Sequence, residues 1–158
     1  PFHASSIDDE RRLHELLSFV PLRLAHAALP GMRARGRGWI LTVASFAAFI
    51  PYGSYSAAKA HAVNLSRSIR SRYSHDGIRA TALCPGFVHT EFHERMGIEE
   101  DAPAWMWASA DDVARRGVRG LRRNQPIVHS NLAHAAMAGA LGVVPDRWQG
   151  ALMRSYRD

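Results

Sequence analysis

Short continuous apolar runs alternate along the chain with longer segments in which apolar residues recur every three or four positions. The runs at 39–45 and 78–84 are bounded by glycine, proline or polar turn residues, which is typical of strands buried on both faces. Between them, residues 54–73 predict a long helix with Ser54 as its N-cap. The buried stripe of this helix is predicted to comprise Ala58, Ala62, Leu65 and Ile69.

Another helix is predicted before the first of these strands, at about 10–30. Acidic residues open it, and one face is apolar, with Leu13, Leu16, Val20, Leu24 and Ala27. Pro21 should kink this helix, because proline cannot donate a backbone hydrogen bond. Pro30 and Gly31 should end it.

The remaining pattern predicts helices at about 110–123, 130–141 and 146–156, with a short last strand at 126–129. Strands and helices therefore alternate, which favours an α/β fold with a parallel sheet. At 158 residues the chain is long enough for one domain, 1–158, in which 124–158 forms a C-terminal helical tail. Because the chain begins with Pro1 and not methionine, we expect a fragment or a processed product.

The composition narrows the class of protein. The single cysteine, Cys84, excludes an internal disulfide and fits a reducing compartment, so we expect a cytoplasmic protein. The net charge of +6 could suit a phosphate-bearing partner. However, the basic run at 114–123 has no accompanying aromatic residues or reading motif, so we expect a solvated helix face and no nucleic acid.

Two weaker signals have simpler explanations. His89 and His93 are four residues apart, but no glutamate directly follows the first histidine, so we expect no metal site. The amphipathic, basic stretch at 146–156 could touch a membrane surface or cover a subunit interface. Packing on its own domain is the simpler expectation.

The segment "YGSYSAAKA" places Tyr55 and Lys59 one turn apart on the long helix. Tyr55 falls in the first turn, where the positive end of the helix dipole favours a phenolate, and the Lys59 ammonium favours it further. A free phenol ionises only at about pH 10, so both effects suit this tyrosine to acid–base work near neutral pH. A pair of these residues at this spacing is not specific by itself.

The surrounding order makes the signal more specific. Ser45 closes one predicted strand, and "CPG", 84–86, closes the next. The carboxyl ends of parallel strands meet at one sheet edge, where ligands of open α/β sheets bind. Cys84 itself is expected to be a small buried apolar residue and not a nucleophile.

The chain resembles the short-chain dehydrogenase/reductase family over roughly 8–123. The features that carry the resemblance lie in the segment "WILTVASFAAFIPYGSYSAAKAHAVNLSRSIRSRYSHDGIRATALCPGFVHTEF". The resemblance implies a Rossmann-like parallel sheet with flanking helices, incomplete at the N-terminus. It also implies an enzyme that transfers hydride between a nicotinamide and an unidentified ketone or secondary alcohol. The cofactor would be NADP or NAD, with NADP the preferred expectation.

The resemblance also implies residue roles. Tyr55 would be the general acid/base, Lys59 would assist it and hold the nicotinamide ribose, and Ser45 would polarise the substrate oxygen. Pro85, Gly86, Val88 and Thr90 would contact the cofactor, although Thr90 could equally be a helix cap. Trp105, Met106 and Trp107 could line an apolar substrate pocket. Homo-oligomers are expected through the helices at 10–30 and 54–73.

Several features depart from the family pattern. The glycine-rich turn and the residue that selects NAD or NADP have no counterpart here. No asparagine stands near 17–19, where most members carry one, and the ten-residue spacing from Ser45 to Tyr55 is short. These departures leave a second hypothesis open, in which the chain is a catalytically silent remnant that acts as an interaction or assembly module.

Overall fold

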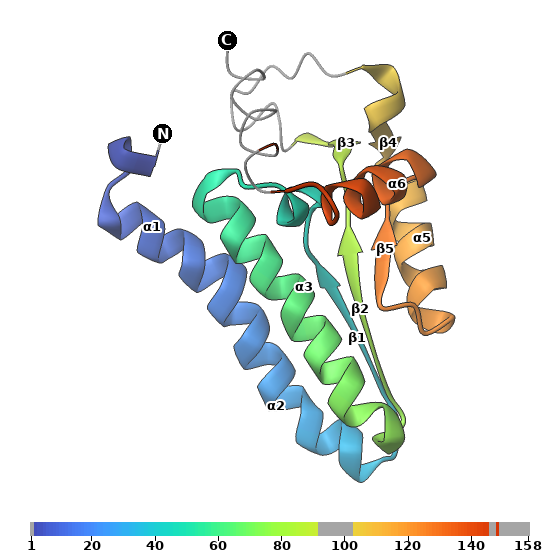
Figure 1. Ribbon diagram of the computed structural model, residues 1–158. Helices are drawn as coiled ribbons and strands as arrows, with labels where there is room; N and C mark the ends of the chain where they lie inside the picture. The colour runs from blue at the N-terminus through green and yellow to red at the C-terminus, as the bar shows by residue number, and fades with distance from the viewer. Residues whose placement is uncertain (1, 92–102, 146–147, 149–158) are drawn as a thin grey trace.

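A three-stranded parallel sheet forms the centre of the molecule (Figure 1). The computed structural model describes residues 2–91, 103–145 and 148. The strand order is β1-β2-β5, with β1 at Gly38–Val43, β2 at Ile78–Cys84 and β5 at Ile127–His129. The strands predicted at 78–84 and 126–129 are therefore confirmed, while the first strand ends at Val43, before Ser45.

Helices cover both faces of this sheet. α3 (Gly53–Tyr73) and α2 (Val20–Ala34) pack on one face, and α5 (Ala110–Arg122) packs on the other. The side chains of β2 alternate accordingly: Ala82 packs against α3, whereas Leu83 packs with Val113 of α5. This burial on both faces explains why the β2 sequence is almost continuously apolar, and it confirms the expected α/β architecture.

The long helix α3 carries the predicted apolar stripe. Ala58, Ala62 and Ile69 are buried, and Leu65 packs against the core from a half-buried position. The predicted N-cap is wrong, because the cap position is Tyr52 and the helix begins at Gly53. The hydroxyl of Ser54 instead acts on a neighbouring chain segment: hydrogen bonding from Ser5 and then from Ser54 lowers the pKa of the Glu10 carboxyl.

The first predicted helix is longer than expected and is irregular in its middle. α1 (Ile7–His14) passes through a π-helical segment, η2 (Glu15–Phe19), into α2. The irregularity ends two residues before Pro21, where proline removes a backbone donor, and the kink expected there stays a prediction. Pro30 does not end the helix as predicted, and lies inside α2. Because His26 and Pro30 are exposed, water can satisfy the carbonyl that proline leaves unpaired.

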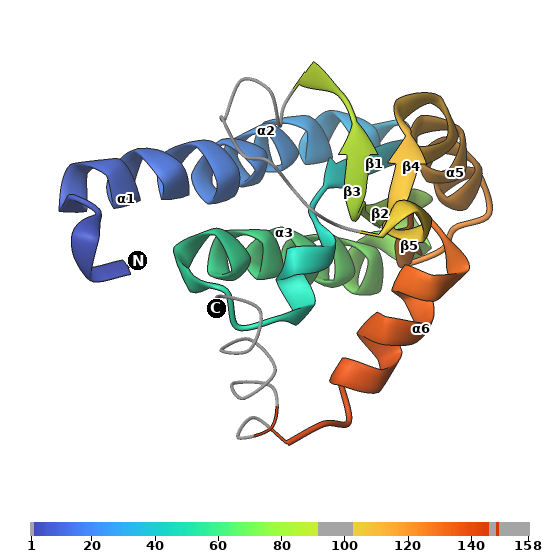
Figure 2. The ribbon, with the colours of Figure 1, turned by 90° about the horizontal axis from the view of Figure 1, so that it is seen from above.

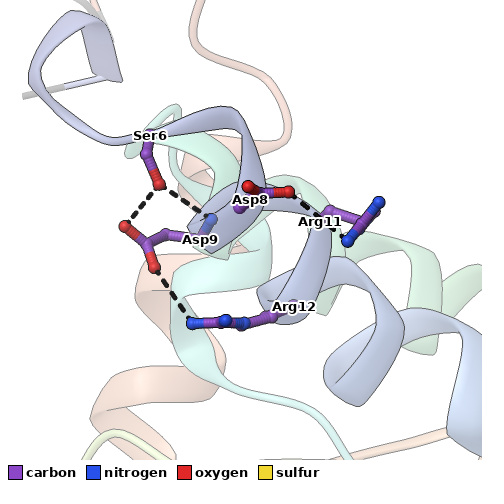
Figure 3. Close-up of polar contacts among 5 residues, drawn as sticks. All are labelled: Ser6, Asp8, Asp9, Arg11 and Arg12. Atoms are coloured by element: carbon purple, nitrogen blue, oxygen red, sulfur yellow. Dashed lines mark hydrogen bonds and ion pairs between the residues drawn. The ribbon is translucent and has the colours of Figure 1, made fainter.

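Local polar contacts set the start of α1 (Figure 3). Ser6 is its N-cap: its hydroxyl oxygen accepts from the backbone N–H of Asp9 at 3.1 Å, and its O–H donates to the Asp9 carboxylate at 2.7 Å. Ion pairs join Arg11 to Asp8 at 3.4 Å and Arg12 to Asp9 at 3.8 Å. All four charged side chains are exposed, so these pairs orient the first turn and contribute little stability.

A second, two-stranded parallel sheet follows the turn after β2. It pairs β3 (Phe87–His89) with β4 (Trp107–Ser109), which lie side by side above the main sheet (Figure 2). The last described helix, α6 (Leu132–Leu141), agrees with the expected helix at 130–141. The helix expected at 146–156 lies outside the described residues except for Trp148. Among the described helices, none is both long enough and apolar enough to cross a bilayer.

Two glycines in adjoining turns need the left-handed backbone region. Gly36 has a φ of 62° and Gly77 a φ of 75°. A Cβ at Gly36 would meet nothing within 4 Å, whereas one at Gly77 would lie 2.0 Å from the Gly36 carbonyl oxygen. These turns connect α2 to β1 and α3 to β2.

We therefore expect Gly77→Ala to be the more destabilising of a matched pair. Gly36→Ala should lower the free energy of unfolding by about 1 kcal/mol through backbone strain alone. Gly77→Ala adds a backbone collision and should lower it by about 2–4 kcal/mol. Urea unfolding of both variants measures the difference, and equal losses would contradict the close approach of the two turns.

Candidate active site

Ser45, the second residue after the end of β1, lies at the carboxyl-terminal edge of the main sheet. Its hydroxyl oxygen accepts from the backbone N–H of Ala47 at 3.1 Å and so caps η3 (Phe46–Phe49), a short 3₁₀ helix. The backbone beside it is tied to the neighbouring strand, because the Phe46 N–H donates to the Pro85 carbonyl at 2.7 Å. The segment that carries Ser45 is thus held against the turn that carries Pro85.

Tyr55 and Lys59 lie on successive turns of α3, as the sequence spacing predicts. The Lys59 ammonium is 5.6 Å from the centroid of the Tyr55 ring. It also donates to the Val43 carbonyl at 3.3 Å, which anchors it to the end of β1. The first turn of α3 contains no acidic residue, so no side-chain charge there opposes a phenolate at Tyr55.

Burial changes the acidity of two groups at this edge. It lowers the pKa of Lys59, since an ammonium removed from water is less favourable than a neutral amine, and the nearby Cys84 opposes this effect. Burial also raises the pKa of the Cys84 thiol to about 12. This cysteine has no exposed surface and stays neutral, which agrees with the expected inert role.

The turn after β2 carries the other expected cofactor contacts. The Gly86 N–H donates to the Ser130 hydroxyl at 3.2 Å. Val88 lies in β3, and the Thr90 hydroxyl just beyond it donates to the Val88 carbonyl at 3.5 Å. The structure therefore holds Pro85 and Gly86 close to the Ser45 segment, and places Val88 and Thr90 further along the chain.

The sequence-based reasoning missed Ser130 and His134. Ser130 directly follows β5, and His134 lies in the first turn of α6, where both are buried. A signal was available in the sequence, because Ser130 directly follows the strand predicted at 126–129, and the pairing of Cys84 with His129 puts it at the same sheet edge as Pro85. Among the described residues, no group of three or more His, Cys, Asp or Glu side chains is placed to hold a metal ion, and His93 lies outside them.

Comparison with known proteins identifies the family. The family model for short chain dehydrogenase matches residues 1–101, which is more than half of the chain. The chain belongs to the short-chain dehydrogenase family. This confirms the resemblance on which the expected residue roles rest, although it does not test each role.

Relatives and solved structures agree with this membership. The chain is 39% identical over 134 residues to cis-4-hydroxycyclohexanecarboxylate dehydrogenase of Sinomonas cyclohexanicum, which covers 82% of this chain and 50% of the relative. It is 35% identical over 102 residues to 2-keto-3-deoxy-L-fuconate dehydrogenase of Xanthomonas campestris pv. campestris, covering 60% of this chain and 33% of the relative. A short-chain dehydrogenase from Sphingobium yanoikuyae in complex with NADPH superimposes with a TM-score of 0.79 at 28% identity.

That alignment covers 97% of this chain and 59% of the Sphingobium chain. The short-chain dehydrogenase chain described here thus spans a third to about three fifths of the length of the proteins compared. The shared part contains the parallel sheet and the helices that flank it.

The buried ammonium of Lys59 leads to a prediction about stability. In the unfolded chain this group keeps its proton up to its ordinary pKa of 10.5, whereas the folded chain releases it at lower pH. Stability therefore rises with pH between these two values, and near neutral pH the folded state carries the cost of a partly buried charge. Water can replace the lost donor at the half-exposed end of β1.

We expect Lys59→Met to have a higher melting temperature than the parent near neutral pH, with the gap narrowing as pH approaches 10.5. Arg67→Met, on the exposed side of the same helix, is the control and should change the melting temperature little. Calorimetry at several pH values measures both. A lower melting temperature for Lys59→Met at neutral pH would contradict the expectation.

Proposed function

We propose that this chain carries the proton-transfer site of an NAD(P)-dependent oxidoreductase that interconverts a ketone and a secondary alcohol. The observation that carries the proposal is the position of the Lys59 ammonium between the Tyr55 ring and the end of β1. Family membership supplies the reaction class, because the relatives are named as dehydrogenases.

In the reducing direction, the Tyr55 hydroxyl gives its proton to the carbonyl oxygen of the substrate. A nicotinamide held at this edge would supply the hydride that the carbonyl carbon receives, so that the ketone would become an alcohol as the cofactor is oxidised. Lys59 stabilises the phenolate that Tyr55 leaves, and the N-terminal end of α3 adds to this effect. The Ser45 oxygen accepts from the Ala47 N–H, which leaves the Ser45 O–H to donate a hydrogen bond that would polarise the substrate oxygen.

The residues present fit the nicotinamide end of the cofactor. Lys59 has donors beyond the one used on Val43 and can bind the ribose hydroxyls. Pro85 and Gly86 form a half-buried turn at the same edge, and the Val88 backbone and Thr90 hydroxyl continue from it. The chain has no glycine-rich turn of the dinucleotide-binding kind, so its residues account for this end only. We favour NADP, as a related structure is in complex with NADPH.

An apolar substrate fits the side chains near this edge. Trp105 is half exposed and is held by its carbonyl, which accepts from the Asn131 side chain at 3.2 Å. Trp107 is instead engaged within the structure, since it stacks on His89 with ring centroids 4.7 Å apart. We therefore assign a substrate contact to Trp105 and a packing role to Trp107.

We propose that the protein acts as a homo-oligomer in the cytoplasm. Large apolar side chains are exposed on the helix that spans α1, η2 and α2: Leu16 is 65% exposed and Leu24 67%. A second subunit would cover this surface together with α3, as the family resemblance implies. No role for nucleic acid or a membrane enters the proposal.

Tyr55→Phe tests the mechanism directly, because it removes only the transferable proton. We expect kcat for carbonyl reduction to fall about 10²- to 10⁴-fold in the protein as naturally produced, with the affinity for NADPH nearly unchanged. Tyr52→Phe is the matched control, since this exposed tyrosine lies three positions earlier and should leave kcat unaltered. Retention of most of the rate by Tyr55→Phe would show that another group transfers the proton.

A further inference from the structure

Among the described residues, His134 and Cys84 are the titratable side chains that have no exposed surface. Its ring has no exposed surface and lies against the Pro85–Gly86 turn: a Cβ built on Gly86 would be 2.3 Å from the ring atoms Cε1 and Nε2. The ring centroid is also 5.2 Å from that of Phe46, which directly follows Ser45. His134 thus touches both segments that bracket the proposed nicotinamide position.

Hydrogen bonds at this ring define its tautomer. The Gly86 N–H donates to Ser130 Oγ at 3.2 Å, and Ser130 Oγ is 2.9 Å from His134 Nδ1. If Nδ1 carried the proton, both the Ser130 O–H and His134 Nε2 would lack partners. If Nε2 carries it, the Ser130 O–H donates to Nδ1 and only Nε2 stays unpaired in this part of the chain. The network therefore favours a neutral ring with its proton on Nε2.

With this tautomer the hydrogen bonds run in one direction: the Gly86 N–H donates to Ser130 Oγ, and the Ser130 O–H donates to His134 Nδ1. The orientation of the Ser130 hydroxyl depends on His134, and the position of the Gly86 N–H depends on that hydroxyl. The same turn accepts the Phe46 N–H through the Pro85 carbonyl at 2.7 Å. One buried imidazole is thus in contact with both the segment that follows Ser45 and the Gly86 turn.

We propose that His134 is a positioning residue: as a neutral imidazole acting through Ser130, it holds the Gly86 turn in the conformation that binds the nicotinamide, and protonation of the ring releases that turn. The proposal rests on the proposed function for the identity of the bound group, but the hydrogen-bond chain itself does not. It adds a residue to the site and makes cofactor binding sensitive to acid.

The surroundings of the ring oppose a positive charge. The side chains and backbone placed against it, from Phe46, Gly86, Trp105 and Ser130, carry no charge, and the titratable neighbour among the described residues is His129. Burial lowers the pKa of His134, and burial together with the proximity of His134 lowers the pKa of His129. The folded state therefore resists protonation at this position, and its stability falls as pH drops through and below the ordinary value of 6.5.

Two substitutions at His134 separate acceptor, ring and charge. His134→Asn keeps an acceptor for the Ser130 O–H but cannot be protonated in this range, while His134→Phe keeps a ring and removes the acceptor. In the protein as naturally produced, NADPH titration should show about tenfold weaker binding for the parent at about pH 4.5 than at about pH 7.5, beyond any change in His134→Asn, because burial moves the protonation of His134 below its ordinary pKa of 6.5. His134→Phe should bind about tenfold more weakly than the parent at the higher pH and follow the His134→Asn profile otherwise.

Measurements without cofactor test the hydrogen bonds from Gly86 through Ser130 to His134 independently of NADPH binding. Nitrogen NMR of the unsubstituted protein should show His134 with its proton on Nε2 at about pH 7.5. The protection factor of the Gly86 amide, which compares its exchange rate with that of an unstructured peptide at the same pH, should be smaller at about pH 4.5 than at about pH 7.5. A proton on Nδ1, or a protection factor unchanged by acid, would overturn the proposal whether or not NADPH binds. If NMR and exchange show these hydrogen bonds but NADPH does not bind at any pH, the proposed function fails and the positioning of Gly86 by His134 stands.

Discussion

The parallel pairing of β1, β2 and β5 is the constraint on which the candidate site depends. Val43 pairs with Leu83, and Leu83 with Val128, so the three strands reach the same edge in register. The residues that follow them, Ser45, Pro85 and Ser130, come from distant parts of the sequence and lie at one edge because of this register. Two backbone bonds of 2.7 Å, from Ala44 to Leu83 and from Phe46 to Pro85, extend the pairing beyond the strands.

Burial at this edge has opposite consequences for stability and for chemistry. Lys59 is partly removed from water, which disfavours its charge, yet in the proposed mechanism the same low-polarity surroundings would strengthen its interaction with the phenolate. The Val43 carbonyl compensates the ammonium in part and fixes its direction. A position that costs folding energy is thus where a charge acts most strongly, and this trade-off is common at catalytic sites.

His134 shows a related use of burial on the other side of the Pro85–Gly86 turn. An imidazole that fills the space beside Gly86 leaves no room for a side chain at that position, which gives a packing reason for glycine there. The ring contacts of Phe46 and Phe49 with His134 and His129 join η3 to β5 and α6. These aromatic contacts therefore support the proposed site.

The sequence alone determined the fold class, the span of β2 and the helix that carries Tyr55 and Lys59. These features follow from local periodicity, and a spacing of four on a helix places two side chains on one face whatever surrounds them. The sequence also indicated the family, which the match over residues 1–101 confirms. Sequence reasoning was wrong at two positions: Ser54 does not cap α3, and Pro30 lies within α2, where the exposed position of His26 lets water pair with the carbonyl that proline leaves without a donor.

Only the tertiary structure decided which side chains meet at the sheet edge and how strongly each is buried. The bond from Lys59 to Val43, the lowered pKa of Lys59 and the chain from Gly86 through Ser130 to His134 all join residues from separate elements. Sequence patterns report the period of one segment at a time. Burial and hydrogen bonding at a site depend instead on how several segments pack, and this packing is a property of the folded molecule.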